Sequence, residues 1–316
     1  MQSGPVTGSF RGCGDGDNVQ LPGVYAEEGK TMNLIIRPGT PKDAERCGTI
    51  CFEAFAAITS RHGFPQLLPS PEAAQENFAS HLSHPGYHVL VAEQDGRLLG
   101  SVVIDERSLI AGVGPLTVDP AVQDIAIGRR LMQAVLERES KRRCPGLRLC
   151  QDAYHNRSLA LYAKLGFEVR EPLVVLQGAP LEIKFPDYTV RRARVEDLET
   201  CNVLCRRIFG YDRGDELRDA VTAGTATLVE RDNRCSGYAT LIGYGGHAVG
   251  ETDTDLKALI GAALQFSGPG FLLPIRNTEL FRWCLEHELR IVKIMILMSA
   301  WLYHDPQGAF LPSITG

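Results

Sequence analysis

The sequence predicts an α/β protein of two domains that arose by tandem duplication. The chain has 316 residues, which is more than one average domain needs and leaves room for two hydrophobic cores. Strand-like and helix-like segments alternate along it, as in mixed α/β folds. A segment near the beginning also recurs in the middle of the chain, as expected for a duplicated unit.

The repeat relates residues 35–55 to residues 189–209, each of which reads as a strand followed by a helix with an acidic start. The matching positions are Arg37/Arg191, Asp43/Asp197, Glu45/Glu199, Cys47/Cys201, Cys51/Cys205 and Phe55/Phe209. Because no further ligand lies near the paired cysteines, we expect them to pack in a core rather than bind a metal. The similarity continues in residues 89–104 and 227–242, each of which predicts two strands joined by a polar turn.

Composition and the repeat together predict the domain boundaries. Residues 1–31 are rich in glycine, contain few large apolar side chains and show no periodicity, so we expect a disordered extension. Met32 directly precedes the first strand-like run, which makes Met1 and Met32 both candidate translation starts. We expect the first domain at residues 32–180 and the second at residues 186–316.

The rest of the first domain reads as strand, helix, strand, helix and strand. The first of these strands ends at Pro120, and the following helix carries apolar residues at helical spacing, namely Ile127, Leu131, Met132, Val135 and Leu136. Pro145 and Gly146 mark the end of that helix. Residues 146–153 then predict a buried strand, residues 156–167 a short helix with its closing turn, and residues 168–178 a last strand.

Charge and composition exclude several classes of partner. The formal net charge of −5 gives no sign of a nucleic-acid-binding protein or of a basic membrane surface. No apolar run is long enough to span a membrane, and no signal-peptide pattern opens the chain. The nine cysteines include no CxxC pair, which favours reduced thiols. We therefore expect a cytoplasmic protein that binds a small soluble ligand, without a nucleic-acid, membrane or metal partner.

One stretch predicts an anion-binding site. The strand that ends near Val118 runs through a turn with the small residues Ala126 and Gly128 into the helix that begins near Arg129 and Arg130. The beginning of a helix offers unpaired backbone N–H groups and the positive end of its dipole. Small residues allow the main chain to approach a phosphate closely, and the arginines add charge. A pyrophosphate would fit these requirements.

Two signatures in this region resemble those of the GNAT superfamily of N-acetyltransferases. Residues 123–128 resemble its Q/R-x-x-G-x-G/A phosphate loop, although Ala126 replaces the first glycine and Asp124 adds a negative charge. Alanine suits that position if its backbone is not left-handed. Asn156, Ser158 and residues 161–167 resemble the second signature. The resemblance covers about residues 33–178, and it implies two tandem GNAT-like domains, each with a mixed, mostly antiparallel sheet flanked by helices.

The resemblance also implies acetyl-CoA as acyl donor and assigns residues to it. Its pyrophosphate would bind the loop and the helix start, and its pantetheine arm would pair like an added strand with the preceding strand, which is expected to splay from residues 147–151. A backbone N–H near Val118 would polarise the thioester. Tyr162 would act as general acid to the departing thiolate. The expected cofactor-binding residues are Leu116, Thr117, Val118, Gln123, Ile125, Ala126, Ile127, Gly128, Arg129, Arg130, Asn156 and Ser158.

The acceptor side is less determined. An amine with a pKa near 10 must lose a proton before it attacks, which costs roughly 4 kcal/mol at neutral pH. Glu93, Asp152 and His155 lie near strand ends and are candidate bases, and the sequence does not select among them. His62 and Phe64 follow the first long helix and are candidates for contact with the acceptor.

The second domain is expected to be degenerate. Glu251, Asp253 and Asp255 occupy the place of the phosphate loop, and the segment that corresponds to the tyrosine signature, residues 279–292, has lost its Gly-Phe turn. We therefore expect a transferase that acetylates a primary amine of a small molecule, with only the first domain active. A protein N-terminal or lysine acetyltransferase and a non-catalytic CoA-sensing module remain alternatives, and a homodimer is possible.

Overall fold

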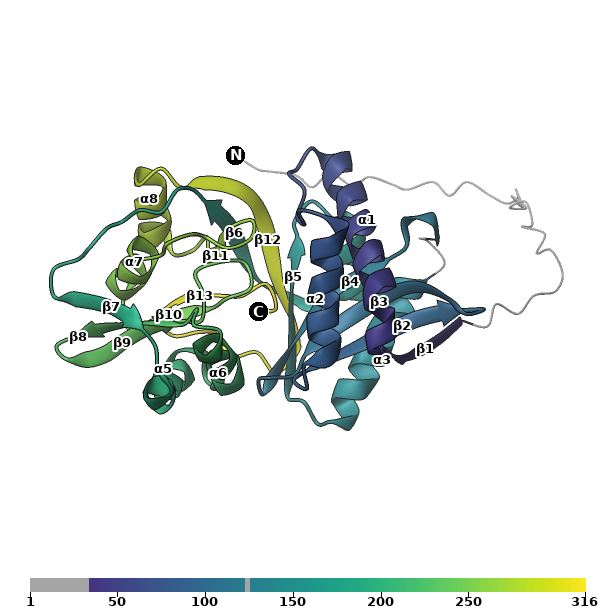
Figure 1. Cartoon of the computed structure of the whole chain (residues 1–316), viewed down its shortest axis with the longest axis horizontal. Coiled ribbons are helices and arrows are strands. Elements are labelled where there is room, and N and C mark those ends of the chain that lie inside the picture. The colour runs from purple at the N-terminus through teal and green to yellow at the C-terminus, as the bar shows by residue number, and fades with distance from the viewer. Residues whose placement is uncertain (1–33, 123–125) are drawn as a thin grey trace, which may run out of the picture. The chain divides into compact units, whose positions relative to one another are not determined.

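The structure is a computed structural model that describes residues 34–122 and 126–316. The expected extension at residues 1–31 and the candidate start Met32 lie outside the described residues, as do Gln123 and Ile125. The described part is an α/β fold with an eight-stranded and a five-stranded sheet, both flanked by helices (Figure 1). Pairing within the sheets is antiparallel except between one pair of strands, which confirms the predicted mixed, mostly antiparallel architecture.

The first half of the chain, residues 34–180, contains the elements that the sequence predicts and one more helix. They are β1 (Leu34–Pro38), α1 (Ala44–His62), α2 (Pro71–Ser83), β2 (Tyr87–Gln94), β3 (Arg97–Asp105), β4 (Ile110–Val118), α3 (Ile127–Lys141), β5 (Gly146–Asp152), α4 (Asn156–Lys164) and β6 (Glu168–Gln177). Helix α2 is the addition; the side chain of Ser70 caps it, and Pro71 occupies its first turn.

The second half, residues 186–316, repeats this order in shorter form. Its elements are β7 (Tyr188–Arg192), α5 (Leu198–Phe209), α6 (Gly214–Thr222), β8 (Thr227–Arg231), β9 (Arg234–Ala239), β10 (Ala248–Gly250), α7 (Asp253–Gly261), β11 (Phe271–Pro274), α8 (Thr278–Glu286), β12 (Arg290–Trp301) and β13 (Ala309–Leu311). Single turns of 3-10 helix (Pro41–Asp43, Pro120–Val122 and Val195–Asp197) complete the assignment. None of the helices in the described ranges is long and apolar enough to cross a bilayer.

The residues shared by the two repeats hold equivalent corners of the two halves. Arg37 bridges Asp43 (2.9 Å) and Glu93 (2.6 Å), and this ties the start of α1 to β1 and β2. Arg191 contacts Asp197 (2.8 Å) and Glu230 (2.9 Å) in the same way. The repeated cysteines on α1 and α5 are buried in hydrophobic clusters, which confirms the predicted packing role.

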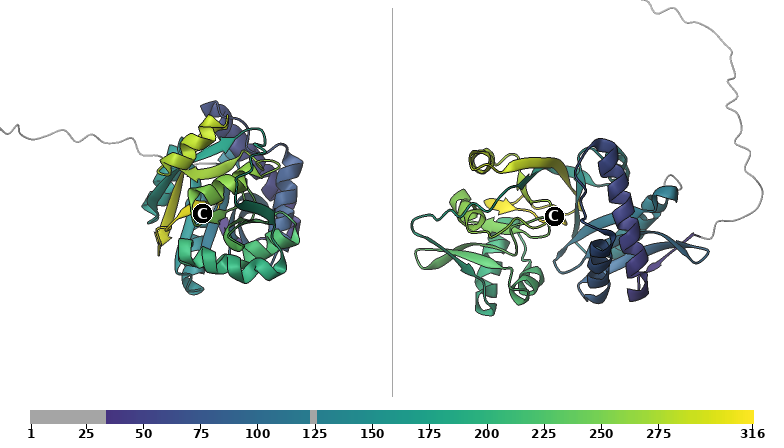
Figure 2. Two further views of the ribbon diagram at one scale, coloured as in Figure 1. Left: turned by 90° about the vertical axis from the view of Figure 1, so that its left-hand side faces the viewer. Right: turned by 45° about the horizontal axis from the view of Figure 1, so that its top comes forward.

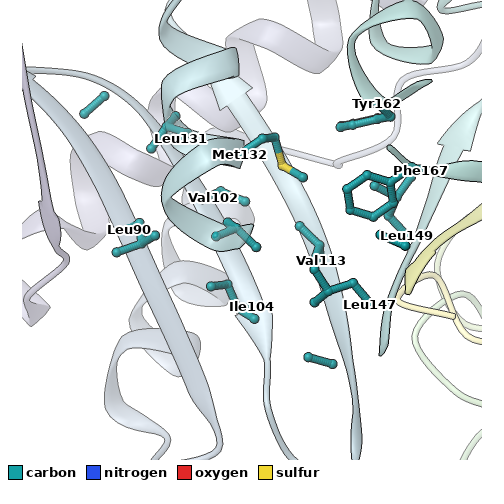
Figure 3. Close-up of a cluster of buried hydrophobic side chains, with 14 of the residues drawn as sticks. Leu90, Val102, Ile104, Val113, Leu131, Met132, Leu147, Leu149, Tyr162 and Phe167 are labelled. Carbon is teal, nitrogen blue, oxygen red and sulfur yellow. The ribbon is translucent and has the colours of Figure 1, made fainter. Parts of the chain in front are cut away.

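Helices cover both faces of the first-half sheet (Figure 2). Alternate residues of a strand point to opposite faces, so Val89 and Val91 of β2 pack with α1 and α2, while Leu90 and Ala92 pack in the cluster that includes α3. Figure 3 shows part of this second cluster, in which Met132 of α3 and Phe167 after α4 lie over the strands. The first-half sheet therefore has an α1/α2 face and an α3/α4 face.

The two halves exchange their last long strands. In the large sheet, β12 of the second half lies between β5 and β6 of the first half, and β6 in turn pairs with β11 of the second half (Figure 1). The whole of β5 is paired with β12, from Trp301↔Gly146 to Met295↔Asp152. The sequence places the domain boundary between residues 180 and 186, and this boundary stays a prediction because the sheets cross it.

The exchange predicts that the halves hold together without a covalent link. A protease site inserted after Pro180, which is exposed, should give fragments that co-elute in size-exclusion chromatography after cleavage. They should separate only in denaturant, because each fragment supplies a central strand to the other. Separation of the cleaved fragments under native conditions would contradict this arrangement.

Candidate acyl-transfer site

The site begins where β4 and β5 stop pairing. Their parallel ladder contains only Ile110↔Gly146, Ala111↔Leu147 and Gly112↔Arg148, although both strands are described in full and both continue. Beyond this ladder β4 pairs with β3, and β5 pairs with β12. The expected splay is therefore present. We call the parts of the two strands that no longer pair with each other, β4 after Gly112 and β5 after Arg148, the β4–β5 fork.

Asp119 anchors the end of β4 at the fork. Its carboxylate is buried and receives ion pairs from Arg46 of α1 (2.7 Å) and from Arg97 of β3 (2.8 Å). It also accepts a hydrogen bond from the backbone N–H of Ala121. These contacts and the burial act in opposite directions on the pKa of Asp119, and the net effect is a lowered pKa. The chain is thus held firmly just before the loop that leads to α3.

The backbone at Ala126 differs from the sequence-based expectation. Ala126 precedes α3 and has φ 62° and ψ 16°, which is the left-handed region that we expected it to avoid. This conformation costs a non-glycine residue about 1–2 kcal/mol because of its Cβ. The turn therefore has the geometry that the glycine of the phosphate-loop signature would adopt without strain.

Ile127, Gly128 and Arg129 form the first turn of α3, where N–H groups point away from the helix end. Arg129 is exposed. Arg130 is engaged elsewhere, because its backbone N–H donates to Ala126 O (3.1 Å) and its guanidinium donates to Leu34 O (2.6 Å). The backbone N–H of Arg130 is therefore used within α3, and a contribution of its side-chain charge to anion binding stays a prediction.

Helix α4 brings the second signature to the α3/α4 face of the fork. Asn156 is its exposed first residue, and His155 caps it by accepting a hydrogen bond from the Ser158 N–H at Nδ1 (3.2 Å). Burial lowers the pKa of His155, so the imidazole stays neutral and able to accept. This capping role disfavours His155 as the catalytic base.

Tyr162 lies one turn after Ser158 and is almost completely buried in the cluster that contains Leu149 and Phe167 (Figure 3). Burial raises its pKa well above the usual range, and a hydrogen bond with Ser158 opposes this rise. The phenol therefore stays protonated and holds a proton that it can donate. This is the protonation state that a general acid requires.

Alternation along the two strands divides the side chains of the fork between the two faces. Leu116 and Val118 of β4 pack with the α3/α4 cluster, and Gly128 faces them with its Cα hydrogen. Leu147 and Leu149 of β5 belong to the same cluster, so Gln151 points to the same side. Thr117 and Asp152 point to the opposite α1/α2 face.

Two polar side chains at the fork are buried without partners. Gln151 is 6% exposed, and neither its Oε1 nor its Nε2 has a hydrogen-bond partner. Thr117 is 4% exposed, and its Oγ1 is also unpaired. Each unmet group of this kind costs about 1–3 kcal/mol. Sequence reasoning named Thr117 for its backbone and missed Gln151, because a glutamine in a predicted buried strand carries no signal of its own.

The remaining candidate bases lie in different places. Glu93 is bound by Arg37 near the outer edge of the sheet, at β1 and β2, and not at the fork. Asp152 lies at the end of β5 and accepts a hydrogen bond from the Tyr154 hydroxyl (3.0 Å). The rings of Phe64 and His62, which follow α1, lie 4.2 Å and 5.0 Å from the Tyr154 ring. The structure thus brings both predicted acceptor contacts close to Asp152.

The second half fills its own equivalent of the fork. Strand β10, the counterpart of β4, pairs with β9 on one side and with β13 on the other. A strand of the chain itself therefore lies along β10 on the side that corresponds to the β5-facing side of β4. Glu251 follows β10 and is held by Arg207, Arg231 and Arg234. The hydrogen bond from Arg234 is the largest of the contacts that lower the pKa of Glu251 to about 2.

Residues 85–169 match the family model of the acetyltransferase (GNAT) domain. The chain contains a GNAT domain. This match includes β4, the described part of the phosphate-loop region, β5 and α4, so the fork lies inside the domain. A comparison with curated protein sequences finds no match.

Solved structures show that the described part of the chain has a tandem GNAT fold. A putative acetyltransferase from Pyrococcus horikoshii aligns with a TM-score of 0.69 and 20% identity over 90% of this chain and 94% of that chain. A GCN5-related N-acetyltransferase from Sphaerobacter thermophilus gives 0.54 and 14% over 86% and 96%. A tandem GNAT protein from the clavulanic acid biosynthesis pathway gives 0.52 and 14% over 85% and 98%.

No metal centre accompanies the fork within residues 34–122 and 126–316. No three His, Cys, Asp or Glu side chains of these ranges are arranged to hold a metal ion. His81 and His84 are close in sequence, but neither lies in a cluster of metal-ligating side chains. His81 is largely buried beside Phe78, and His84 contacts Asp219 (3.3 Å).

Proposed function

We propose that this protein is an N-acyltransferase that moves the acetyl group of acetyl-CoA to a primary amine of a small molecule. The observation that carries the proposal is the β4–β5 fork with its two unpaired, buried polar side chains. Gln151 offers an amide on the α3/α4 face of the fork, and Thr117 offers a hydroxyl on the opposite face. An acyl carrier with amide groups in its arm would satisfy them.

The residues of the fork fit such a carrier along its length. The N–H groups of Ile127, Gly128 and Arg129 face the position of a diphosphate, and the positive end of α3 favours its charge. Leu116 and Val118 supply apolar contacts on the α3/α4 face. Asn156 lies exposed at the start of α4. When bound, acetyl-CoA supplies an activated thioester.

Tyr162 is the proposed proton donor for the leaving sulfur. Its hydroxyl is buried at the α3/α4 face and stays protonated. It can therefore protonate a thiolate without first taking up a proton from solvent. Positioned proton donors contribute about 10²–10⁴ in rate. The acceptor is proposed to approach from the α1/α2 face, where His62, Phe64 and Asp152 meet.

The proposal predicts one CoA site per chain. Isothermal titration calorimetry should give a stoichiometry of one, because β13 occupies the strand edge in the second half that the cofactor arm would need. Release of free thiol from acetyl-CoA in the presence of a panel of primary amines should accompany binding. Two equal sites would contradict the role of β13, and tight binding without transfer to any amine or peptide would favour the CoA-sensing alternative.

Substitution of Gly128 should separate binding from folding. A Cβ at this position would meet its nearest neighbours, Leu161, Val118 and Leu116, at 3.6–3.9 Å, so Gly128→Ala should leave the unfolding midpoint unchanged or slightly raised. CoA affinity should fall about tenfold or more, because the methyl group occupies space that the diphosphate needs. Ala126→Gly is the matched control, since it removes a methyl group and its backbone strain from the same turn, and it should bind CoA at least as tightly as the wild type. Equal affinity of Gly128→Ala and wild type would place the diphosphate elsewhere.

Substitution of Tyr162 tests the proton donor. Tyr162→Phe should lower kcat about 100-fold and leave the dissociation constant of CoA almost unchanged, because the hydroxyl acts only when the sulfur departs. The control is Tyr188→Phe in the second half, whose hydroxyl binds Arg231 and lies far from the fork along the chain. Stopped-flow measurement of thiol release distinguishes the variants. Unchanged turnover in Tyr162→Phe would reduce Tyr162 to a packing residue.

A further inference from the structure

A buried ion pair joins the exchanged strand to the fork. Lys293 of β12 places Nζ 2.7 Å from Oδ1 of Asp152, the last residue of β5, and the two side chains are only 5% and 7% exposed. The other oxygen of Asp152 accepts the hydrogen bond from Tyr154. Lys293 comes from the second half of the chain, and strand exchange delivers it to the first.

The pair is poorly explained by stability. Taking two charges out of water costs several kcal/mol per ion, and a buried pair repays this only with good geometry and further hydrogen bonds. The geometry here is incomplete, because Oδ1 of Asp152 forms no directed hydrogen bond in spite of its short distance to Nζ. Among residues 34–122 and 126–316, Lys293 has no other ion partner, and its ammonium lies 5.4 Å from the centre of the Tyr244 ring.

The position of the pair is the second observation. Asp152 lies four residues beyond Arg148, where pairing with β4 ends, and it points to the α1/α2 face. Tyr154 connects it to Phe64 and His62, the residues at the acceptor side. A contact path therefore runs from β12 through the end of β5 to the loop after α1.

We propose that Asp152 accepts the proton of the acceptor amine, and that Lys293 is the positioning residue that holds the Asp152 carboxylate in place and favours the neutral form of the amine. The proposal deepens the proposed acyltransferase function and rests on it. A cation disfavours a second cation nearby, so the Lys293 ammonium makes an incoming alkylammonium easier to deprotonate.

The step balances in atoms and protons. The acceptor enters as R–NH₃⁺ and transfers one proton to the Asp152 carboxylate, which later releases it to solvent. The nitrogen lone pair then forms the C–N bond, the C–S bond breaks, and its electron pair leaves with the sulfur. The sulfur takes a proton from Tyr162. The nitrogen then loses its second proton, and this proton restores the hydroxyl of Tyr162. The products are the amide, the free thiol of CoA and one released proton.

Several other titratable groups act on Asp152 and enter its pH response. Tyr154 donates to it directly, and burial raises the pKa of Tyr154 so that it remains neutral. His155 on the same loop and Tyr244 before β10 also interact with its charge, while His62 acts on His155. None of these groups carries a positive charge as close to Asp152 as Lys293 does.

The first test replaces the carboxylate. The amine of the panel that releases thiol fastest in the wild type serves as the acceptor. Asp152→Asn keeps the shape of the side chain, and we expect kcat with this amine to fall by about 10²–10⁴ while CoA affinity changes less than threefold. Asp219→Asn is the matched control, because Asp219 also forms an ion pair, in its case with Arg107, but lies on α6 in the second half. Wild-type-like turnover in Asp152→Asn would overturn the proposal and leave the acyltransferase function standing.

The second test replaces the cation and reads the pH profile. In Lys293→Met, kcat/KM for the amine should reach its plateau about 1 to 3 pH units higher than in the wild type, because the acceptor ammonium then holds its proton more strongly. Lys293→Arg retains the charge and should show the wild-type pH profile. This variant still tests the proposal if Lys293→Met is too unstable to assay. Lys257→Met, which breaks a different lysine ion pair in the second half, is the control and should not shift the profile.

The outcomes separate the two proposals. A wild type that binds no CoA, or that transfers to no amine, would overturn the proposed function and this inference with it. If the wild type transfers the acetyl group, two results would overturn only the role of Lys293. One is a shifted pH profile in Lys293→Arg, and the other is a kcat/KM in Lys293→Met that drops equally at all pH values. Circular-dichroism melts and CoA affinity of each variant show whether the fold is retained.

Discussion

The termination of the β4–β5 ladder after Gly112 and Arg148 is the constraint on which the rest of the structure depends. A continuous sheet would satisfy every backbone group in this region and would leave no edge for a ligand. Because the two strands stop pairing, β4 keeps β3 as its neighbour and β5 needs another partner on its far side. The exchanged strand β12 is that partner, and it holds β5 along its whole length while β4 follows a different course.

Strand exchange makes the second half part of the site without giving it a site of its own. Strand β12 brings Lys293 to Asp152, and β13 closes the corresponding edge in the second half. A duplicated unit that has lost the phosphate-loop signature can still be required for the chemistry of its partner. In the proposed function, the duplication therefore yields one asymmetric centre rather than two equal ones.

The polar groups around the fork differ in how completely ion pairs and hydrogen bonds satisfy them. Asp119 and Glu251 are bound by several arginines, and such carboxylates define the ends of strands. Gln151 and Thr117 lack partners, and Asp152 has only part of what a buried carboxylate needs. Fully paired charges describe the scaffold, whereas these three incompletely paired groups lie at the fork, where a ligand is proposed.

The sequence by itself determined the tandem α/β architecture, the order of the main elements and the two helix starts that surround the fork. These follow from local patterns: periodicity, the repeated Arg37/Asp43 corner and the small residues before α3. It did not determine the exchange of β6 and β12, since strand pairing between distant segments leaves no local pattern and a hydrophobic strand suits either neighbour. It also could not show that Asp152 meets Lys293, predict the left-handed turn at Ala126 or show that Arg130 binds Leu34. Only the tertiary structure decided these points, because each depends on which side chains from remote segments meet in space.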